Sequence, residues 1–119
     1  MKKILLVDDD EFLHPLYREE LEKEGYETHS ALTGEEALSH LDIIKPDLII
    51  LDINMPGMSG IEALRRIKEI SPHIPVILCS AYQEFKHNLA SWASEEYVVK
   101  SADLGELKAA VNRHITGYK

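Results

Sequence analysis

Short apolar runs alternate with longer amphipathic segments along the whole chain. The runs are Ile4–Val7, 26–31, Leu48–Leu51, Val76–Cys79 and Tyr97–Val99. The first, third and fourth are continuously apolar, which is typical of parallel strands buried on both faces. The second contains Thr28 and His29, a mixture that favours a strand at the edge of a sheet. The pattern therefore predicts five short strands.

The segments between and after these runs carry apolar side chains at helical spacing. The stripes are Leu13, Tyr17 and Leu21; Ala37, Leu38 and Leu41; Ile61, Leu64, Ile67 and Ile70; Phe85, Leu89 and Trp92; and Leu107, Val111 and Ile115. Thr33 with Glu36, and Asp103 with Glu106, have the spacing of capping boxes ahead of two of these helices. Pro15 stands near the start of the first stripe, so that helix either begins late or lacks one backbone hydrogen bond.

The strict alternation of strands and helices indicates an α/β fold, with a parallel sheet, right-handed crossovers and helices on both faces. A chain of 119 residues suits one compact domain over positions 1–119. At this size we expect a flavodoxin-like, doubly wound, five-stranded parallel sheet of order 2-1-3-4-5 with five helices.

Composition narrows the class of protein. The apolar share of 45% is ordinary for a globular domain, and the formal net charge of −8 argues against a nucleic-acid surface, which needs clustered Lys and Arg. Excess acid favours plain solubility, a cation ligand or a basic partner.

The single cysteine, Cys79, lies inside an apolar run, so we expect a small buried side chain and a reducing compartment. No run reaches transmembrane length, and Asp8–Asp10 ends the first run too early for a secretory signal. We therefore expect a cytoplasmic protein with no membrane partner.

The candidate chemistry lies where strands end. In a doubly wound sheet, ligands bind beyond the carboxyl ends of the strands, at the switch point between strands one and three. Asp8 and Asp9 follow strand one and Asp52 follows strand three, and neighbouring strands lie ~4.8 Å apart. Carboxylates this close repel one another unless a cation lies between them, and oxygen ligands of this kind suit Mg²⁺. Acids also follow strands simply as turn formers, but acids on both sides of the switch point favour the metal.

Two further strand ends supply groups that suit an anion. Ser80 ends strand four, one strand from Asp52, and Lys100 ends strand five. A lysine two strands away, about 10 Å, can span most of that gap. Acids, a hydroxyl and an ammonium group together predict a metal ion beside a site for a tetrahedral anion, with one carboxylate as the nucleophile.

On these residues, the chain resembles the receiver domains of two-component response regulators. The matching stretches are Ile4–Asp9, Pro46–Gly60, Pro75–Ala81 and Tyr97–Lys100. They follow the family's order and spacing, and the resemblance covers essentially the whole chain. It implies a phosphoacceptor signalling domain of a two-component system or phosphorelay, a regulator rather than an enzyme. Its partners would be a sensor histidine kinase or a histidine phosphotransfer protein, which donates the phosphoryl group from a phosphohistidine, and a downstream effector.

The resemblance also implies a role for each matching site residue. Asp52 would accept the phosphoryl group and share in binding Mg²⁺, for which Mn²⁺ can substitute. Asp9 would bind the ion directly, Asp8 would bind it largely through water, and the backbone carbonyl of Asn54 would be a further ligand.

Three residues would respond to the new phosphoryl group. Lys100 would contact one of its oxygens, Ser80 would turn toward it after transfer, and Tyr97 would change rotamer together with Ser80. New negative charge on Asp52 draws in a hydroxyl and an ammonium group, and that movement would repack the surface made by the fifth strand with the fourth and fifth helices.

The sequence departs from the family pattern in two places. Ser101 follows Lys100, where receivers usually have a proline, often after a cis bond. Because a non-proline cis bond costs ~3 kcal/mol, we expect a trans bond and some displacement of Lys100. Ala93 and Ser94 stand where the family commonly has Gly-Ala, so we expect the fourth helix to end differently or to be mobile.

Other functions are less well matched. A phosphatase of the haloacid-dehalogenase type, the main alternative, carries Asp-x-Asp after its first strand and needs a cap, for which this chain has no room. A flavodoxin needs a Ser/Thr-rich phosphate loop after that strand, and a P-loop enzyme needs Gly-Lys-Ser/Thr; neither is present. A degenerate receiver would lack some of the acids or Lys100.

The histidines show no metal-ligand spacing, and we expect them to be ordinary surface or boundary residues. They are His14, His29, His40, His73, His87 and His114.

Overall fold

Five parallel strands form a single sheet at the centre of the molecule. The structure is a computed structural model of the chain, and it describes residues 1–81, 94–101 and 103–116. The strands are β1 (Lys3–Val7), β2 (Glu27–Ala31), β3 (Leu48–Leu51), β4 (Val76–Ser80) and β5 (Glu96–Val99). Their order in the sheet is β2-β1-β3-β4-β5, with every pair parallel. The predicted fold class, strand order and edge position of β2 are confirmed, and each predicted strand end lies within one residue of the observed end.

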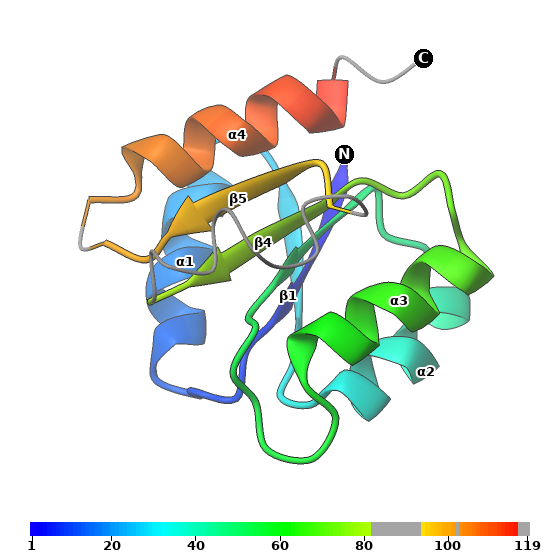
Figure 1. The fold of residues 1–119 in the computed structure, drawn as a ribbon. Coiled ribbons are helices and arrows are strands. Elements are labelled where there is room, and N and C mark those ends of the chain that lie inside the picture. The colour runs from blue at the N-terminus through cyan, green and yellow to red at the C-terminus, as the bar shows by residue number, and fades with distance from the viewer. Residues whose placement is uncertain (82–93, 102, 117–119) are drawn as a thin grey trace.

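Helices cover both faces of the sheet. They are α1 (Leu13–Lys23), α2 (Gly34–Ile44), α3 (Gly60–Ile70) and α4 (Gly105–Thr116). Figure 1 shows α1 and α4 against one face, and α2 and α3 against the other. These four correspond to the first, second, third and fifth helices that the sequence predicts. The predicted fourth helix, with Phe85, Leu89 and Trp92, and the following Ala93 lie outside the described residues.

The core has two layers because alternate residues of each strand point to opposite faces. Ile4 and Leu6 of β1 belong to a buried cluster that also holds side chains of α1 and α4. Leu5 and Val7 belong to a second cluster with side chains of α2 and α3. A strand buried on both faces needs an apolar residue at every position, which is why β1, β3 and β4 read as unbroken apolar runs.

The helix starts follow local chemistry, and both predicted capping boxes differ from the structure in part. The Glu36 N–H donates to Thr33 Oγ1 at 3.0 Å, as predicted, whereas the Glu36 carboxylate accepts from the Leu32 N–H at 2.7 Å. At α4 the helix begins at Gly105, one residue later than a capping box at Asp103 requires, so that prediction is wrong in register. The Asp103 carboxylate instead accepts from the Gly105 N–H at 2.9 Å.

Pro15 does not disturb α1. It is the third residue of that helix, and the first four N–H groups of a helix have no partner within it. The helix therefore starts late enough, at Leu13, for a residue without an N–H to be tolerated, and no interior backbone bond is lost.

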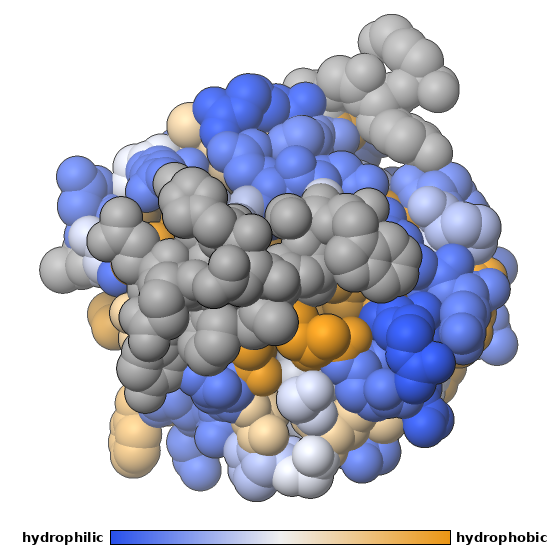
Figure 2. All heavy atoms as spheres, viewed as in Figure 1, coloured by the Kyte–Doolittle hydropathy of each residue, from blue (hydrophilic) through white to orange (hydrophobic). Residues whose placement is uncertain are grey.

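The outer surface is largely polar. In Figure 2 hydrophilic residues dominate the described surface over α4 and around α3, with an apolar patch between them beside the grey atoms. Cys79 is buried, and burial raises the pKa of its thiol to about 12, which confirms the prediction of a small buried side chain. Within the described ranges, none of the helices has the length and apolarity that a membrane span requires.

Candidate functional site

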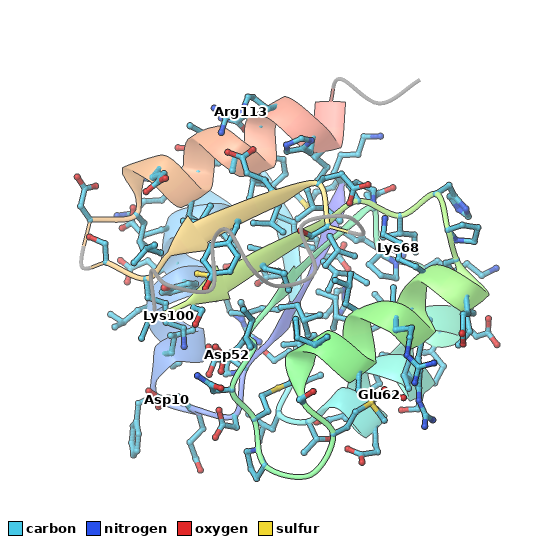
Figure 3. The ribbon with its side chains drawn as sticks, viewed as in Figure 1. Asp10, Asp52, Glu62, Lys68, Lys100 and Arg113 are labelled. Atoms are coloured by element: carbon cyan, nitrogen blue, oxygen red, sulfur yellow. The ribbon has the colours of Figure 1, made fainter. Side chains whose placement is uncertain are left out.

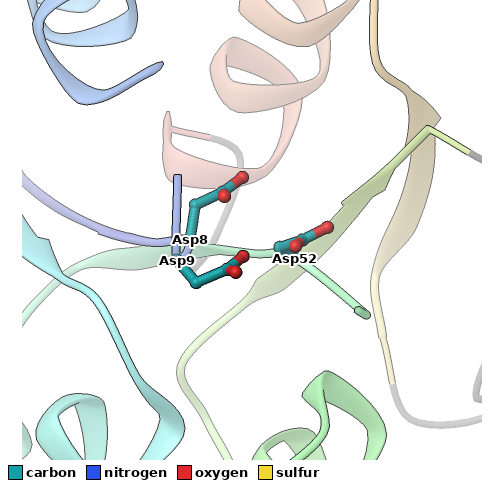
Figure 4. A group of neighbouring side chains, drawn as sticks. All are labelled: Asp8, Asp9 and Asp52. Atoms are coloured by element: carbon teal, nitrogen blue, oxygen red, sulfur yellow. The ribbon is translucent and has the colours of Figure 1, made fainter. Parts of the chain in front are cut away.

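Three carboxylates meet at the carboxyl edge of the sheet. Asp8 and Asp9 directly follow β1, and Asp52 directly follows β3. These strands are neighbours with Val7 opposite Leu51, and the Asp52 N–H donates to the Val7 carbonyl at 2.9 Å. One oxygen from each of the three acids lies within 4.8 Å of the others, and Figure 4 shows the carboxylates gathered at the same point. The predicted convergence is confirmed.

The acids differ in their contact with solvent. Asp8 and Asp52 are 3% and 5% exposed, whereas Asp9 is exposed. Burial, helped by the charges of Asp8 and Asp9 and opposed by Lys100, raises the pKa of Asp52 to about 6. The site therefore holds more negative charge than its own groups compensate. A divalent cation bound by these oxygens would reverse that balance, and hard carboxylate ligands are those that Mg²⁺ prefers.

Lys100 follows the edge strand β5, two strands from β3, and its side chain extends to the acids. Its Nζ lies 2.7 Å from Asp8 Oδ2 and 3.4 Å from Asp52 Oδ1, and Figure 3 shows it beside Asp52 at the strand ends. Burial disfavours its charge, but the hydrogen bond to Asp8 and the two carboxylate charges outweigh burial and raise the pKa of Lys100. No described peptide bond is cis, so the Lys100–Ser101 bond is trans, as expected. Any displacement caused by Ser101 leaves the ammonium group within the site.

Asp8 is held by several contacts at once. Its Oδ1 accepts from the Asp10 N–H at 2.9 Å and its Oδ2 pairs with Lys100. Its own N–H donates to the Ala31 carbonyl at 3.1 Å, and its carbonyl lies 2.8 Å from His14 Nε2. Both carboxylate oxygens and both backbone polar groups of this residue are therefore engaged.

The loop after Asp52 is shaped by a close approach to α3. A Cβ at Gly60 would lie 2.0 Å from the Asp52 carbonyl oxygen and 2.6 Å from Ile53 Cα. Only glycine fits where the first residue of α3 packs against the residue that carries the acid. Gly57 has φ of +74°, a conformation that glycine adopts without strain, and so makes a turn in this loop. Asn54 is exposed within this loop.

Ser80 and Tyr97 lie on the two strands beyond β3. Ser80 is fully buried at the end of β4, and the Lys100 N–H donates to its carbonyl at 2.7 Å. Tyr97 is buried in the middle of β5 and belongs to the cluster on the α2 and α3 side. Ser80 thus lies at the carboxyl edge of the sheet with the acids, whereas Tyr97 lies further back along β5.

His14 was not foreseen as part of this region. It is 6% exposed and contacts the backbone of Asp8, so the expectation of an ordinary surface or boundary residue is wrong for this histidine. The signal was present in the sequence. His14 precedes Tyr17 by three residues and Leu21 by seven, which places it on the buried stripe of α1.

Comparisons with known proteins agree with this fold. The model of the family described as the response regulator receiver domain matches residues 4–112. The chain therefore belongs to the response regulator receiver family, whose members are regulators rather than conventional enzymes.

Several relatives have the same extent. Sporulation initiation phosphotransferase F of Bacillus subtilis is 37% identical over 116 residues, which cover 96% of this chain and 94% of that protein. Chemotaxis protein CheY of Thermotoga maritima is 32% identical, with 94% of this chain and 96% of that protein covered. By contrast, the chain spans 25% of the regulatory protein AtoC of Escherichia coli, to which it is 36% identical.

Solved structures match over nearly the whole chain. The response regulator TrrA of Thermotoga maritima, in complex with Mg²⁺ and BeF, is 46% identical with a TM-score of 0.90, covering 95% of this chain and 98% of that one. TrrA in complex with the histidine kinase ThkA is 44% identical with a TM-score of 0.91, covering 98% and 100%.

Proposed function

We propose that this chain is a single receiver domain over residues 1–119 that accepts a phosphoryl group on Asp52 in a Mg²⁺-dependent reaction. The donor is a phosphohistidine of a sensor histidine kinase or of a histidine phosphotransfer protein. The observation that carries the proposal is a buried Asp52 carboxylate with Asp8 and Asp9 within 4.8 Å and the Lys100 ammonium at 3.4 Å. A cytoplasmic location also remains a prediction from the sequence.

The oxygen donors suit a hard divalent cation. Asp9, Asp52 and the backbone carbonyl of Asn54 would hold the ion, with Asp8 acting through water. This division is supported by the contacts of Asp8, whose two oxygens already accept from the Asp10 N–H and from Lys100. When bound, Mg²⁺ or Mn²⁺ supplies positive charge that offsets the charge of the transferring phosphoryl group. A relative, TrrA, was crystallised with Mg²⁺ and BeF, which supports magnesium.

The reaction forms one bond and breaks one. A lone pair on a carboxylate oxygen of Asp52 attacks the phosphorus, the P–N bond to the donor histidine breaks, and its electron pair returns to the imidazole. The attacking carboxyl must be ionised, and a pKa of about 6 leaves it mostly so at neutral pH. Lys100 stands where its ammonium group can pair with a phosphoryl oxygen and stabilise the charge that develops on transfer.

The new acyl phosphate would then act on Ser80 and Tyr97. Ser80 lies at the end of β4, next to β3, and its hydroxyl would donate to a phosphoryl oxygen. Tyr97 would change rotamer with it and alter the surface that includes β5 and α4, where an effector would bind. The remaining part of the predicted surface, the fourth helix, lies outside the described residues. The complex of TrrA with the kinase ThkA supports a kinase partner.

The test is direct phosphorylation. The chain is incubated with acetyl phosphate and Mg²⁺, and its intact mass is measured with Asp52→Ala and Asp10→Asn as variants. We expect one phosphoryl group that alkali removes, in the wild type and in Asp10→Asn but not in Asp52→Ala. A phosphoryl group retained by Asp52→Ala would overturn the proposal. Continuous turnover of a generic phosphomonoester would favour the phosphatase alternative instead.

A further inference from the structure

His14 is a buried histidine that the proposed chemistry does not use. It lies in the first turn of α1, 6% exposed, with Nε2 2.8 Å from the carbonyl oxygen of Asp8. Its other ring nitrogen, Nδ1, is buried and has no hydrogen-bond partner among the described residues. An apolar side chain would fill this place on the buried stripe of α1 without burying an unpaired nitrogen. The single hydrogen bond to Asp8 is therefore the feature that distinguishes histidine here.

The contact fixes the state of the ring. A carbonyl oxygen can only accept, so Nε2 must carry the hydrogen and donate it to Asp8. The geometry therefore assigns the donor hydrogen to Nε2, and Nδ1 takes no part in the contact.

The acceptor oxygen belongs to the peptide unit that joins Asp8 to Asp9. A peptide unit is planar, so holding this carbonyl sets the orientation of the plane from which Asp9 departs. The Asp8 side chain is fixed separately, by the Asp10 N–H at 2.9 Å and by Lys100 at 2.7 Å. No hydrogen bond or ion pair from the described residues holds the exposed Asp9 carboxylate, so its direction is set by the backbone that His14 holds.

We propose that His14 is a positioning residue of the acidic site, whose Nε2–H holds the Asp8–Asp9 peptide unit and thereby presents Asp9 to a divalent cation. The inference rests on the proposed function, because it gives His14 a role at the same metal site. His14 itself touches neither the ion nor the phosphoryl group. Groups that orient metal ligands typically contribute about 10-fold or more to metal affinity.

The experiment measures Mg²⁺ binding to the unphosphorylated chain by calorimetry, so no activity is required. In His14→Leu the side chain stays apolar and of similar size but loses the donor, and we expect the dissociation constant for Mg²⁺ to rise about 10-fold. In His14→Gln the amide Nε2–H can donate to the same carbonyl, and we expect the constant to return to within about threefold of wild type. Leu21→Ala is the matched control on the same buried stripe of α1. It should lower the melting temperature and leave Mg²⁺ affinity unchanged.

Each outcome of the Mg²⁺-binding experiment either supports or overturns the positioning role of His14. Unchanged affinity in His14→Leu, equal weakening in His14→Gln, or equal weakening in Leu21→Ala would show that His14 is only part of the core. If His14→Leu does not fold, nitrogen-15 NMR of the wild-type ring decides, and a ring that carries its hydrogen on Nδ1 and none on Nε2 overturns the inference. A wild-type chain that binds no Mg²⁺ would sink the proposed metal site as well. Normal Mg²⁺ binding and phosphorylation with unaffected variants would sink this inference alone.

Discussion

The two ends of the sheet treat charge in opposite ways. At the amino end, Lys68 of α3 donates to the Ile74 carbonyl at 2.8 Å and pairs with Glu95 at 3.1 Å, and Glu95 accepts from the Val76 N–H at 2.7 Å. These groups join α3 to the starts of β4 and β5 with their charges matched. At the carboxyl end, three carboxylates share the Lys100 ammonium. One end is assembled to hold elements together, and the other keeps an excess of negative charge that a ligand can neutralise.

The lysines of the two ends provide the sharpest test of this difference. Lys100→Met should slow phosphorylation by acetyl phosphate by about 100-fold, equivalent to about 2.7 kcal/mol, because it removes a charge aimed at the phosphoryl oxygens. Its matched control, Lys68→Met, should phosphorylate at the wild-type rate. Intact mass spectrometry over time measures both rates. Equal rates in the two variants would show that the ends do not differ in function.

Replacing the acceptor should stabilise the fold at neutral pH. The pKa of Asp52 is about 6 in the folded chain, against 3.8 for an ordinary aspartate. The folded state therefore holds this proton more tightly, and stability falls as pH rises from about 4 to 6 and stays low above that range. Without metal, Asp52→Asn should raise the free energy of unfolding by about 2 kcal/mol at pH 7.5.

The gain from Asp52→Asn should shrink toward zero at pH 4, where the carboxyl is protonated in the folded state. Urea denaturation in the presence of a chelator, at several pH values, measures this dependence. A gain that does not vary with pH would contradict the assigned cause, and a loss of stability would show that Asp52 contributes to the fold.

The amino end should respond in the opposite sense. Lys68→Met removes a partly buried cation from the Ile74 carbonyl and leaves Glu95 with only the Val76 N–H among these contacts. We expect the free energy of unfolding to fall by about 1.5 kcal/mol at neutral pH. Urea denaturation provides the number, and an unchanged midpoint would mean that this cluster does not hold α3 to the sheet.

The smallest effect should come from an ion pair on the more exposed surface nearby. Glu96 of β5 pairs with Arg113 and lies 2.8 Å from His114 Nε2. Burial alone would raise the pKa of Glu96, but Arg113 and His114 outweigh it and lower the pKa below its usual value. Glu96→Gln should cost about 0.5 kcal/mol or less, and the difference should shrink in high salt. A cost as large as that of Lys68→Met would mean that burial does not separate the two clusters.

Much of the fold and the core of the site could be predicted because the relevant signals are local. Unbroken apolar runs mark β1, β3 and β4, and an acid at the end of a strand is visible without knowing the fold. The place where Asp8 meets Asp52 followed from strand order, which the alternation of elements strongly restricts. These predictions required no knowledge of side-chain contacts.

The features that were missed depend on contacts between distant segments or on fine register. Lys68 and Glu95 are 27 positions apart, and neither stands out from other charged residues. The role of His14 depends on which atom of β1 its ring meets, although its place on the apolar stripe could have warned of burial. The start of α4 was misplaced because Asp103 caps through an alternative local bond to Gly105.

At Gly60 the first turn of α3 packs directly against the backbone of Asp52, with no space for a side chain between them. Two rigid bodies in such contact cannot move independently, so any shift of the Asp52 main chain has to be shared by α3. The helix in turn is tied at its far end, where Lys68 meets Glu95 and the start of β4. Because α3 contacts the Asp52 backbone at its first residue and the start of β4 through Lys68, a displacement at one end of the helix is transmitted to the other. The two ends of the sheet are therefore connected through α3 as well as through the strands.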